Sequence, residues 1–354
     1  MPGDTSFEDV SLLLHMNGAN GSTSFPDSSI YNQTITPSGN VAINTAQSKF
    51  GGASAYFFPT SVDYLTTPLV LDYTQNLTIE LFCNTVSFQN NRTLVATRYQ
   101  NSHGFSMRIQ TNGRIRFWGY DGTGSTVVDL TTTTAMTTGN WHHVAVVKGG
   151  TAWGLYLNGV LEVTSNQTAN IVDYPGTKLA IGTYFAPAPT EIHYGYIDEL
   201  RITKGVRYLG NFTPPTTEFL NYAGTVSGSL TESLTASNFK THAHKVSDGT
   251  YVGSTIASGT SYSLDTTTLE PVMVTMYPDF GAKWAATTFY PLNSRIYPTD
   301  NAANPYYYIC TSSGTSGGSE PAWPSVGTVS DGSVTWTYVE SMVQPIIHGP
   351  ITPI

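Results

Sequence analysis

Two adjacent carboxylates, Asp198 and Glu199, lie in the aromatic stretch YGYIDELRI (194–202), where they could form a hydrolytic site. Retaining glycosidases hold two carboxyl groups about 5 Å apart beside the sugar. Neighbouring residues of a strand point to opposite faces of a sheet, so we expect Asp198 and Glu199 to face apart. Ile197 and Leu200 do not fit a perfect alternation, which leaves a β-bulge at the acidic pair open. The spacing disfavours a hydrolase and indicates a strand that closes a sheet.

Histidines suggest a second chemistry, metal binding. His142 and His143 are adjacent in WHHVAVVK, so on a strand they face apart and cannot bind one ion together. His242 and His244 share a strand face, but no cysteine or acidic partner lies nearby in the sequence to complete a zinc site. The chain also has no Gly-x-Ser-x-Gly elbow and no phosphate-binding loop. We therefore expect no catalytic residue.

Two hairpins with Asn-Gly turns are expected, in FSMRIQTNGRIRFW and in WGLYLNGVLEV. In the first hairpin, a two-residue loop would mix the two faces, whereas a three-residue loop keeps apolar residues on one face. The three-residue loop pairs Met107 with Phe117, and the same choice in the second hairpin pairs Leu155 with Leu161.

The other face of the first hairpin then carries Arg108 opposite Arg116. Like charges that face each other directly are mildly destabilising. Two interpretations stay open: a solvated face, or a surface that meets an acidic partner or a glycan.

Aromatic side chains are the strongest binding candidates, because rings bury a large area at low entropic cost. In residues 282–340 the candidates are Trp323, which we expect to be exposed in EPAWP, with Tyr306 and Tyr307. On the loops of the preceding region they are Trp118 and Tyr184.

The aromatic residues of the C-terminal module also have a structural interpretation. A module of this size needs large side chains to build a core. We therefore expect Trp284 and Trp336 to be buried there.

Composition indicates an all-β chain. Charged residues make up 11% of the 354 residues, against about 25% in typical soluble domains. Ser, Thr, Asn and Gly are abundant instead, and short alternating segments separated by turn residues predict sandwiches or barrels. The net charge of −9 has no clustered basic patch, so we expect no nucleic-acid partner. Cys83 and Cys310 are 227 positions apart and are expected to be free, buried thiols.

Four segments are expected along the chain. The first domain spans 1–219 and ends at a Pro-Pro boundary, a small β spacer spans 220–281, and a Trp/Tyr-rich module spans 282–340. A Pro-rich extended tail, 341–354, is expected to be ordered only if it docks on a neighbour. The N-terminus shows no signal peptide, and no apolar run is long enough for a membrane helix.

Four stretches of the first domain occur in a recognisable order. Together they resemble the laminin-G-like, concanavalin-A-like jelly-roll domain that is common in bacteriophage virion proteins. The resemblance covers roughly 10–219 and rests on LLLHMNGANGSTSFPDSS, SKFGGASAYF, WHHVAVVK and YGYIDELRITKGVRYLGNFTPP. It implies two packed antiparallel sheets with one curved face.

The later segments resemble other small modules. WAATTFYPLNSRIYPT, YYYICTSSGTSGGSEPAWP and VSDGSVTWTYV are similar to short carbohydrate-binding modules of phage proteins. The spacer resembles immunoglobulin-like or prealbumin-like domains.

These resemblances imply a phage tail, tail-fibre or other virion surface protein that attaches to a host by weak multivalent binding to glycans or other surface structures. The alternatives are a purely structural or decorating virion component and, less favoured, a glycan depolymerase. The implied partners are a host glycan or appendage, other virion proteins and copies of the chain, with a trimer by analogy to fibres. Assembly in the host cytoplasm without membrane insertion would agree with the missing signal peptide.

The resemblance also implies a structural calcium ion that ties the N-terminal region to the last strand. Asp27 in FPDSS and Asp198 would supply the carboxylate ligands. The alternative is an Asx turn at Asp27 and a paired surface carboxylate at Asp198.

Overall fold

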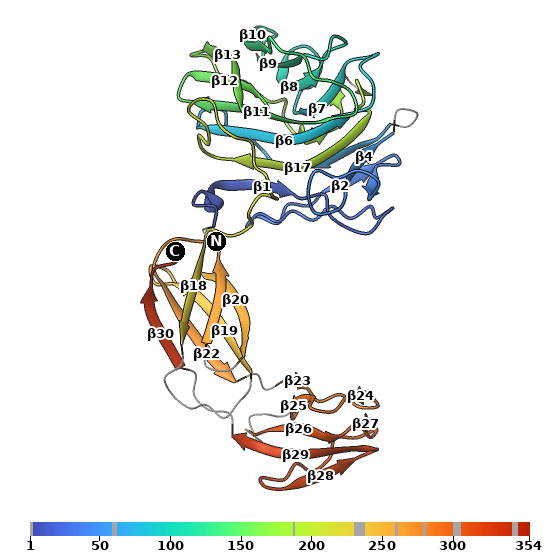
Figure 1. The fold of residues 1–354 in the computed structure, drawn as a ribbon, viewed down its shortest axis with the longest axis vertical. Coiled ribbons are helices and arrows are strands. Elements are labelled where there is room, and N and C mark those ends of the chain that lie inside the picture. Colours follow the sequence, from blue (N-terminus) through green and yellow to red (C-terminus); the bar gives the residue numbers. More distant parts are fainter. Residues whose placement is uncertain are drawn as a thin grey trace. The chain divides into compact units, whose positions relative to one another are not determined.

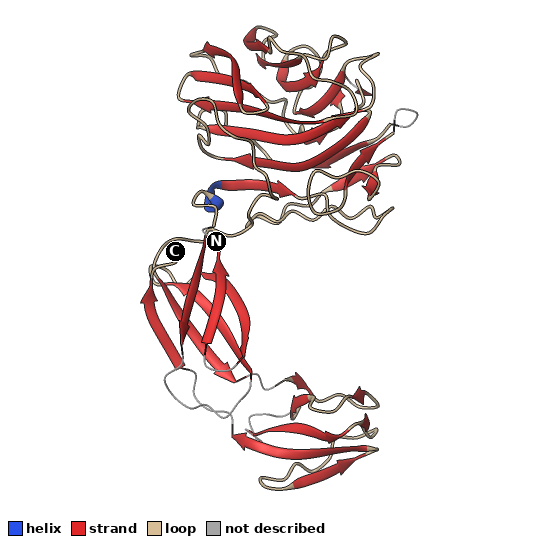
Figure 2. Cartoon of the chain, viewed as in Figure 1, coloured by secondary structure: helices blue, strands red, loops and turns tan. Residues whose placement is uncertain are grey.

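The computed structural model describes residues 3–58, 62–186, 188–229, 238–258, 261–278, 281–299, 306–341 and 346–354. Among them the elements are strands, apart from a short 3-10 helix, η1 (Phe7–Asp9), which confirms the all-β prediction (Figure 2). No helix in the described ranges is long and apolar enough to cross a membrane. The chain divides into two compact units, Asp4–Asn221 and Tyr222–Ile354, the second including the first three residues.

Two antiparallel sheets form the unit Asp4–Asn221 (Figure 1). Sheet A contains, in spatial order, β13 (Val160–Asn166), β12 (Ala152–Leu157), β11 (Trp141–Gly149), β6 (Leu77–Thr85), β17 (Gly195–Thr203), β4 (Ser54–Phe57) and β3 (Ala42–Asn44), while β1 (Val10–Leu14) pairs with the second half of β17. Sheet B contains β10 (Thr126–Thr131), β9 (Ile115–Asp121), β8 (His103–Ile109), β7 (Arg92–Ala96), β14 (Leu179–Ile181), β5 (Tyr64–Thr67) and β2 (Thr36–Ser38). A short ribbon of β15 (Tyr184–Phe185) and β16 (Pro189–Thr190) follows β14.

The inner faces of the two sheets share one apolar core. Leu81 and Trp153 of sheet A and Phe117 of sheet B belong to the same buried cluster, and the Phe117 and Trp153 ring centroids are 5.3 Å apart. Alternation along each strand sends every second side chain into this layer. This is the predicted jelly-roll sandwich, and the core includes Cys83, a free thiol whose pKa burial raises to about 12.

The alternation breaks in β17, where a β-bulge lies at the acidic pair. Ile197 and Leu200 both point into the core, so Asp198 and Glu199 lie together on the outer face of sheet A. Glu199 adopts a φ of +51°, a left-handed conformation that non-glycine residues rarely take. The expectation that the two carboxylates face apart is therefore wrong.

The same outer face buries a network of charges. Glu80 of β6 is fully buried and accepts hydrogen bonds from Arg201 Nε at 3.0 Å and Nη2 at 2.8 Å. His143 lies 3.1 Å from Glu80, and Tyr208 donates to it at 2.7 Å. Burial would raise the Glu80 pKa, but Arg201, His143 and Tyr208 outweigh that effect and hold it well below its usual range. The segment after β17 closes over this face, with Phe212 stacked on Tyr208.

The two predicted hairpins fold differently from each other. In β8–β9, Met107 pairs with Phe117 across a three-residue loop, as predicted, and Gly113 has a φ of +78°. In β12–β13 the loop has two residues, Asn158 and Gly159, and both have positive φ. Leu155 consequently pairs with Val163 and not with Leu161, because a register shift follows between Leu155 and Tyr156.

The unit Tyr222–Ile354 contains small separate sheets. They are β18 (Gly224–Ser229) with β21 (Ser261–Thr266); β20 (Tyr251–Ser258), β19 (Asn238–Lys245), β22 (Val272–Pro278) and β30 (Ile346–Ile351); β23 (Ala282–Lys283), β25 (Arg295–Tyr297), β26 (Tyr306–Ser312), β29 (Val334–Ser341) and β28 (Thr328–Asp331); and β24 (Phe289–Tyr290) with β27 (Gly314–Thr315). The tail supplies β30, which pairs with β22.

Candidate functional site

Four residues singled out from the sequence lie near one another at the outer face of sheet B, namely Trp118, Arg108, Arg116 and Tyr184. Trp118 lies on β9, and the guanidinium groups of Arg108, Arg116 and Arg98 lie 4.5, 4.8 and 5.0 Å from its ring centroid. Arg98 also lies 4.2 Å from the ring centroid of Tyr184 on β15. Three guanidinium groups around one indole are a favourable cation–π arrangement.

Carboxylates offset the repulsion between Arg108 and Arg116, which are directly paired as predicted. Arg108 Nη1 donates to Glu191 Oε1 at 2.6 Å. Arg116 donates from Nε and Nη2 to the two oxygens of Asp129, at 2.8 and 2.6 Å, and these hydrogen bonds raise the pKa of Arg116. Arg108 and Arg116 therefore already have charge partners.

Trp118 is not available to a ligand. It lies on a strand and not on a loop, and only 2% of it is exposed. The prediction that its ring binds a receptor is therefore wrong. The cluster instead supports β15, because Arg98 packs on the ring of Tyr184.

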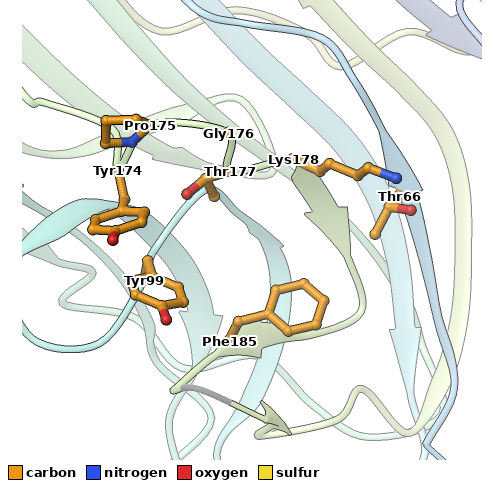
Figure 3. A pocket seen from close by; sticks show the side chains of 8 residues that line it. All are labelled: Thr66, Tyr99, Tyr174, Pro175, Gly176, Thr177, Lys178 and Phe185. Atoms are coloured by element: carbon orange, nitrogen blue, oxygen red, sulfur yellow. The ribbon is translucent and has the colours of Figure 1, made fainter.

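A cavity of about 330 Å³ opens on the other side of β15 (Figure 3). It is lined by Thr66, Tyr99, Tyr174, Pro175, Gly176, Thr177, Lys178 and Phe185. Within β15, Tyr184 contacts the arginine cluster while Phe185 lines the cavity, as alternation along a strand requires.

Aromatic rings form one wall of this cavity. Tyr99 and Tyr174 are stacked, with ring centroids 4.5 Å apart and an interplanar angle of 28°. Tyr174 is 44% exposed, and His103 packs edge-on against it at 5.2 Å. Phe185 is held by an edge contact with Tyr64 at 5.4 Å. These ring contacts hold the wall in place, while Tyr174 keeps a large exposed surface.

The loop that carries Tyr174 owes its shape to its sequence. Tyr174-Pro175-Gly176-Thr177 forms a tight turn in which Thr177 N donates to the Tyr174 carbonyl at 3.0 Å. Proline suits the second position of such a turn, and Gly176 supplies the positive φ of +79° that the third position needs. Asp173 anchors the loop, because its carboxylate accepts hydrogen bonds from the hydroxyl groups of Tyr73 and Thr97.

A basic side chain completes the site. Lys178 is exposed, and Figure 3 shows it extended toward Thr66. In the described parts of the chain no carboxylate pairs with Lys178. The cavity thus combines an aromatic wall, hydroxyl groups and an ammonium group, which suits a ligand with both C–H faces and polar substituents.

Sequence reasoning missed Tyr99, Tyr174, Lys178 and Phe185. They come from three segments that only the pairing of β14 and the β15 ribbon brings together. The Tyr-Pro-Gly turn in DYPGTK was a usable signal, because Pro-Gly predicts a turn, and loops run over the surface and often carry binding residues.

In the C-terminal module, aromatic residues serve the core. Trp284 and Trp336 are buried, as predicted, and both indole N–H groups donate to Asp331 Oδ2, at 2.8 and 3.0 Å. Trp323 is half-buried and not exposed as predicted, because its ring packs on Tyr308 at 4.5 Å.

Of the other two candidates there, Tyr307 is only 1% exposed and cannot form a sugar platform. Tyr306 is half-buried and contacts the edge of Tyr338. The C-terminal module therefore offers little of its predicted aromatic surface.

The two predicted calcium ligands lie in different surroundings. Asp27 accepts hydrogen bonds from the backbone N–H groups of Leu13, Ser29 and Gln33 at 2.7–2.9 Å, and from the Ser29 hydroxyl. Those donors occupy both oxygens, so Asp27 does not fit a calcium site and instead ties the 27–33 turn to β1.

Asp198 has one oxygen without a partner. Its Oδ2 accepts from Lys49 N at 2.7 Å and from Phe50 N at 3.2 Å, while Oδ1 is buried and unbonded. Burial raises the pKa of Asp198 to about 7. The calcium ion stays a prediction, and Asp198 is the member of the pair that could serve it.

Glu199, the neighbour of Asp198, belongs to a cluster with His15 and Glu218 whose ligand atoms lie within 4.8 Å of one another. His15 Nδ1 is 2.8 Å from Glu199 Oε1, and Phe219 N donates to Glu199 Oε2 at 2.9 Å. Hydrogen bonds within the cluster account for its geometry. Glu199 and Asp198 are both fully buried, so they cannot contact a polysaccharide.

Comparison with known proteins agrees with the jelly-roll architecture. Residues 59–208 match the family described as the Concanavalin A-like lectin/glucanases superfamily, a range that includes every residue of the cavity. The sandwich is therefore concanavalin-A-like. No curated protein matches the sequence.

Several solved structures share weak similarity. Domain 4 of AbnA, an extracellular arabinanase from Geobacillus stearothermophilus, solved with arabinotriose, is 20% identical, with 56% of this chain and 93% of that chain covered and a TM-score of 0.44. The Ruminococcus gnavus IT-sialidase CBM40 bound to α2,3 sialyllactose is 18% identical, with 38% and 79% covered and a TM-score of 0.35. The binding domain of botulinum neurotoxin serotype D is 10% identical, with 96% and 81% covered and a TM-score of 0.48.

Proposed function

We propose that the first domain binds glycans in the cavity bounded by Tyr99, Tyr174 and Phe185. The observation that carries this proposal is the stacked tyrosine pair, whose outer ring is half-exposed and held rigidly at the cavity wall. A rigid aromatic face can cover the C–H face of a sugar ring at low entropic cost, and the hydroxyl groups of Thr66 and Thr177 can bond the sugar's own hydroxyl groups.

The chemistry of the lining supports binding over hydrolysis. The eight residues that line the cavity include no carboxylate, whereas glycoside hydrolysis uses a pair of them. The match of residues 59–208 to a superfamily of lectins and glucanases is compatible with either activity. The missing carboxylates favour the lectin-like one.

The wider role we propose is attachment of a bacteriophage particle to its host. Support comes from the resemblance of the first domain to virion jelly-roll domains. In this proposal the chain sits in the virion beside other virion proteins, and trimers present several cavities at once. Many weak sites on one particle increase apparent affinity by about 10²- to 10⁴-fold without any new contact.

One observation favours a structural role for the C-terminal module. The tryptophans of the C-terminal module are used in its own core, which suits a module that packs or decorates better than one that recognises sugar. We assign recognition to the first domain for that reason.

A calcium ion at Asp198 is a separate proposal. The unbonded, buried Oδ1 atom is the observation that supports it. Chelation would then lower the melting temperature of the first domain, because a ligand bound only to the folded state stabilises that state.

The glycan proposal is tested by binding of the full-length protein to an array of host-type and reference glycans. Tyr174→Ala should reduce binding to every recognised glycan at least about tenfold, as expected for a central aromatic anchor. Tyr251→Ala is the matched control, since Tyr251 is a tyrosine of similar exposure in the other unit. Equal losses in both variants would contradict the assignment.

A further inference from the structure

The cavity has an unbalanced positive charge. Lys178 lies in its wall, and no described carboxylate is among the lining residues or pairs with this ammonium group. The chain as a whole carries a net charge of −9, with only 15 lysines and arginines. The Lys178 ammonium group therefore lies where the ligand would.

Nearby carboxylates are turned away from the cavity. Asp173 precedes Tyr174 in the chain, yet its oxygens accept hydrogen bonds from Tyr73 and Thr97 on the inner side of the loop. Burial raises the pKa of Asp173. Asp173 therefore does little to neutralise Lys178.

The arginine cluster behind β15 adds to the same field. Glu191 and Asp129 pair with Arg108 and Arg116. Arg98 is bonded to the Gln100 carbonyl and the Asn101 side chain, and among the described residues no carboxylate pairs with it. Lys178 at the cavity and Arg98 beside Tyr184 are thus two cations that no described carboxylate pairs with.

We propose that the cavity selects acidic glycans, sugars that carry a carboxylate group. The sugar ring lies on Tyr174, and its carboxylate meets the Lys178 ammonium group and the Thr66 hydroxyl beside it. The inference rests on the glycan-binding proposal and names its ligand class.

The test uses the full-length protein and matched glycan pairs that differ in one charge. Suitable pairs are sialylated glycans with their asialo forms, and uronic-acid oligosaccharides with their methyl esters. Lys178→Met keeps the aliphatic stem and removes the charge. Lys283→Met is the control, because Lys283 is an exposed lysine of the other unit and the net charge changes equally.

We expect the wild-type protein to bind the acidic member of a pair about three- to tenfold more tightly, as for a charge-assisted hydrogen bond at a partly exposed site. Lys178→Met should abolish this preference by reducing binding of the acidic member to the level of the neutral member, while Lys283→Met should leave the preference intact.

The outcomes separate the two proposals. If both members of the pairs bind equally, or if the preference survives Lys178→Met, the acidic selectivity is overturned while glycan binding stands. If no glycan on the array binds, the functional proposal fails and the selectivity fails with it.

Discussion

At the scale of single residues, the buried carboxylate Glu80 organises the outer face of sheet A. Arg201 and Arg207 approach it from β17 and the segment after it, and both also pair with Asp4 near the N-terminus. His143 completes the ring of partners. Such a network is costly to break, because removing one partner leaves another charge buried without compensation.

Glu80→Gln should therefore destabilise the first domain by about 3–5 kcal/mol. For a domain of this size that loss lowers the melting temperature by on the order of 10 °C in calorimetry. Glu162→Gln is the control, since Glu162 is a half-buried carboxylate that accepts hydrogen bonds from the uncharged Thr133 and Thr134. A Glu80→Gln melting curve that coincides with the control would show that the network does not stabilise the fold.

His193 gives the fold a specific sensitivity to acid. It is fully buried against Phe57 and near Arg92. Burial, with a smaller effect from the Arg92 charge, lowers its pKa to about 3. An unfolded histidine has a pKa of about 6.5, so above that pH neither state binds the proton. Below it the unfolded state takes up the proton first, and stability falls.

The loss should be about 1.4 kcal/mol for each pH unit between about 6.5 and 3. His193→Phe keeps a ring against Phe57 and removes the titrating group. Melting of the first domain between pH 7 and pH 4.5 should then depend clearly less on pH in the variant. An unchanged pH dependence would mean that other groups control the acid response.

At the scale of elements, the strands and one of the two hairpins could be predicted. Alternation correctly paired Met107 with Phe117 and placed Arg108 opposite Arg116. Alternation predicted the wrong pairing around Asn158-Gly159. These two residues, both with positive φ, form a two-residue turn, and a register shift further along the strand restores the apolar pairing. Face matching alone cannot reveal such a compensation.

The candidate site was predictable only in part. Arg108, Arg116 and Tyr184 do gather near the site, but as its support. The ligand-facing wall combines Tyr99 with Tyr174, which are 75 positions apart in the sequence. No local pattern can show that two such residues stack.

The tail is an element of the second unit and not an appendage. Residues of β30 pair with β22, and Ile354 and Thr225 exchange two backbone hydrogen bonds of 3.2 and 3.0 Å. Val272 and Val274 of β22 are fully buried. A truncation that removes everything after residue 281 would therefore also remove a strand from this sheet.

Deleting 346–354 should lower the stability of the second unit by several kcal/mol, since each lost backbone hydrogen bond contributes about 0.5–1.5 kcal/mol. Hydrogen exchange of the amides in 272–278 should become faster, while the first domain melts as before. Unchanged exchange in β22 would show that β30 adds nothing to the sheet.

At the scale of the whole molecule, the proposed recognition site lies in one unit. The unit Asp4–Asn221 holds the cavity, and the unit Tyr222–Ile354 uses its tryptophans internally. Attachment strength would then come from the number of chains on a particle, because a single shallow cavity gives weak binding. Substitutions in the cavity should consequently have larger effects on particles than on isolated chains.

The most direct measurement is titration of the full-length wild-type protein and Tyr174→Ala with a glycan identified on the array. We expect saturable binding by the wild type, at least about tenfold weaker binding by Tyr174→Ala, and the same melting temperature for the two proteins. Binding that Tyr174→Ala leaves intact would move recognition away from this cavity. Absence of binding to any glycan would contradict the proposed function itself.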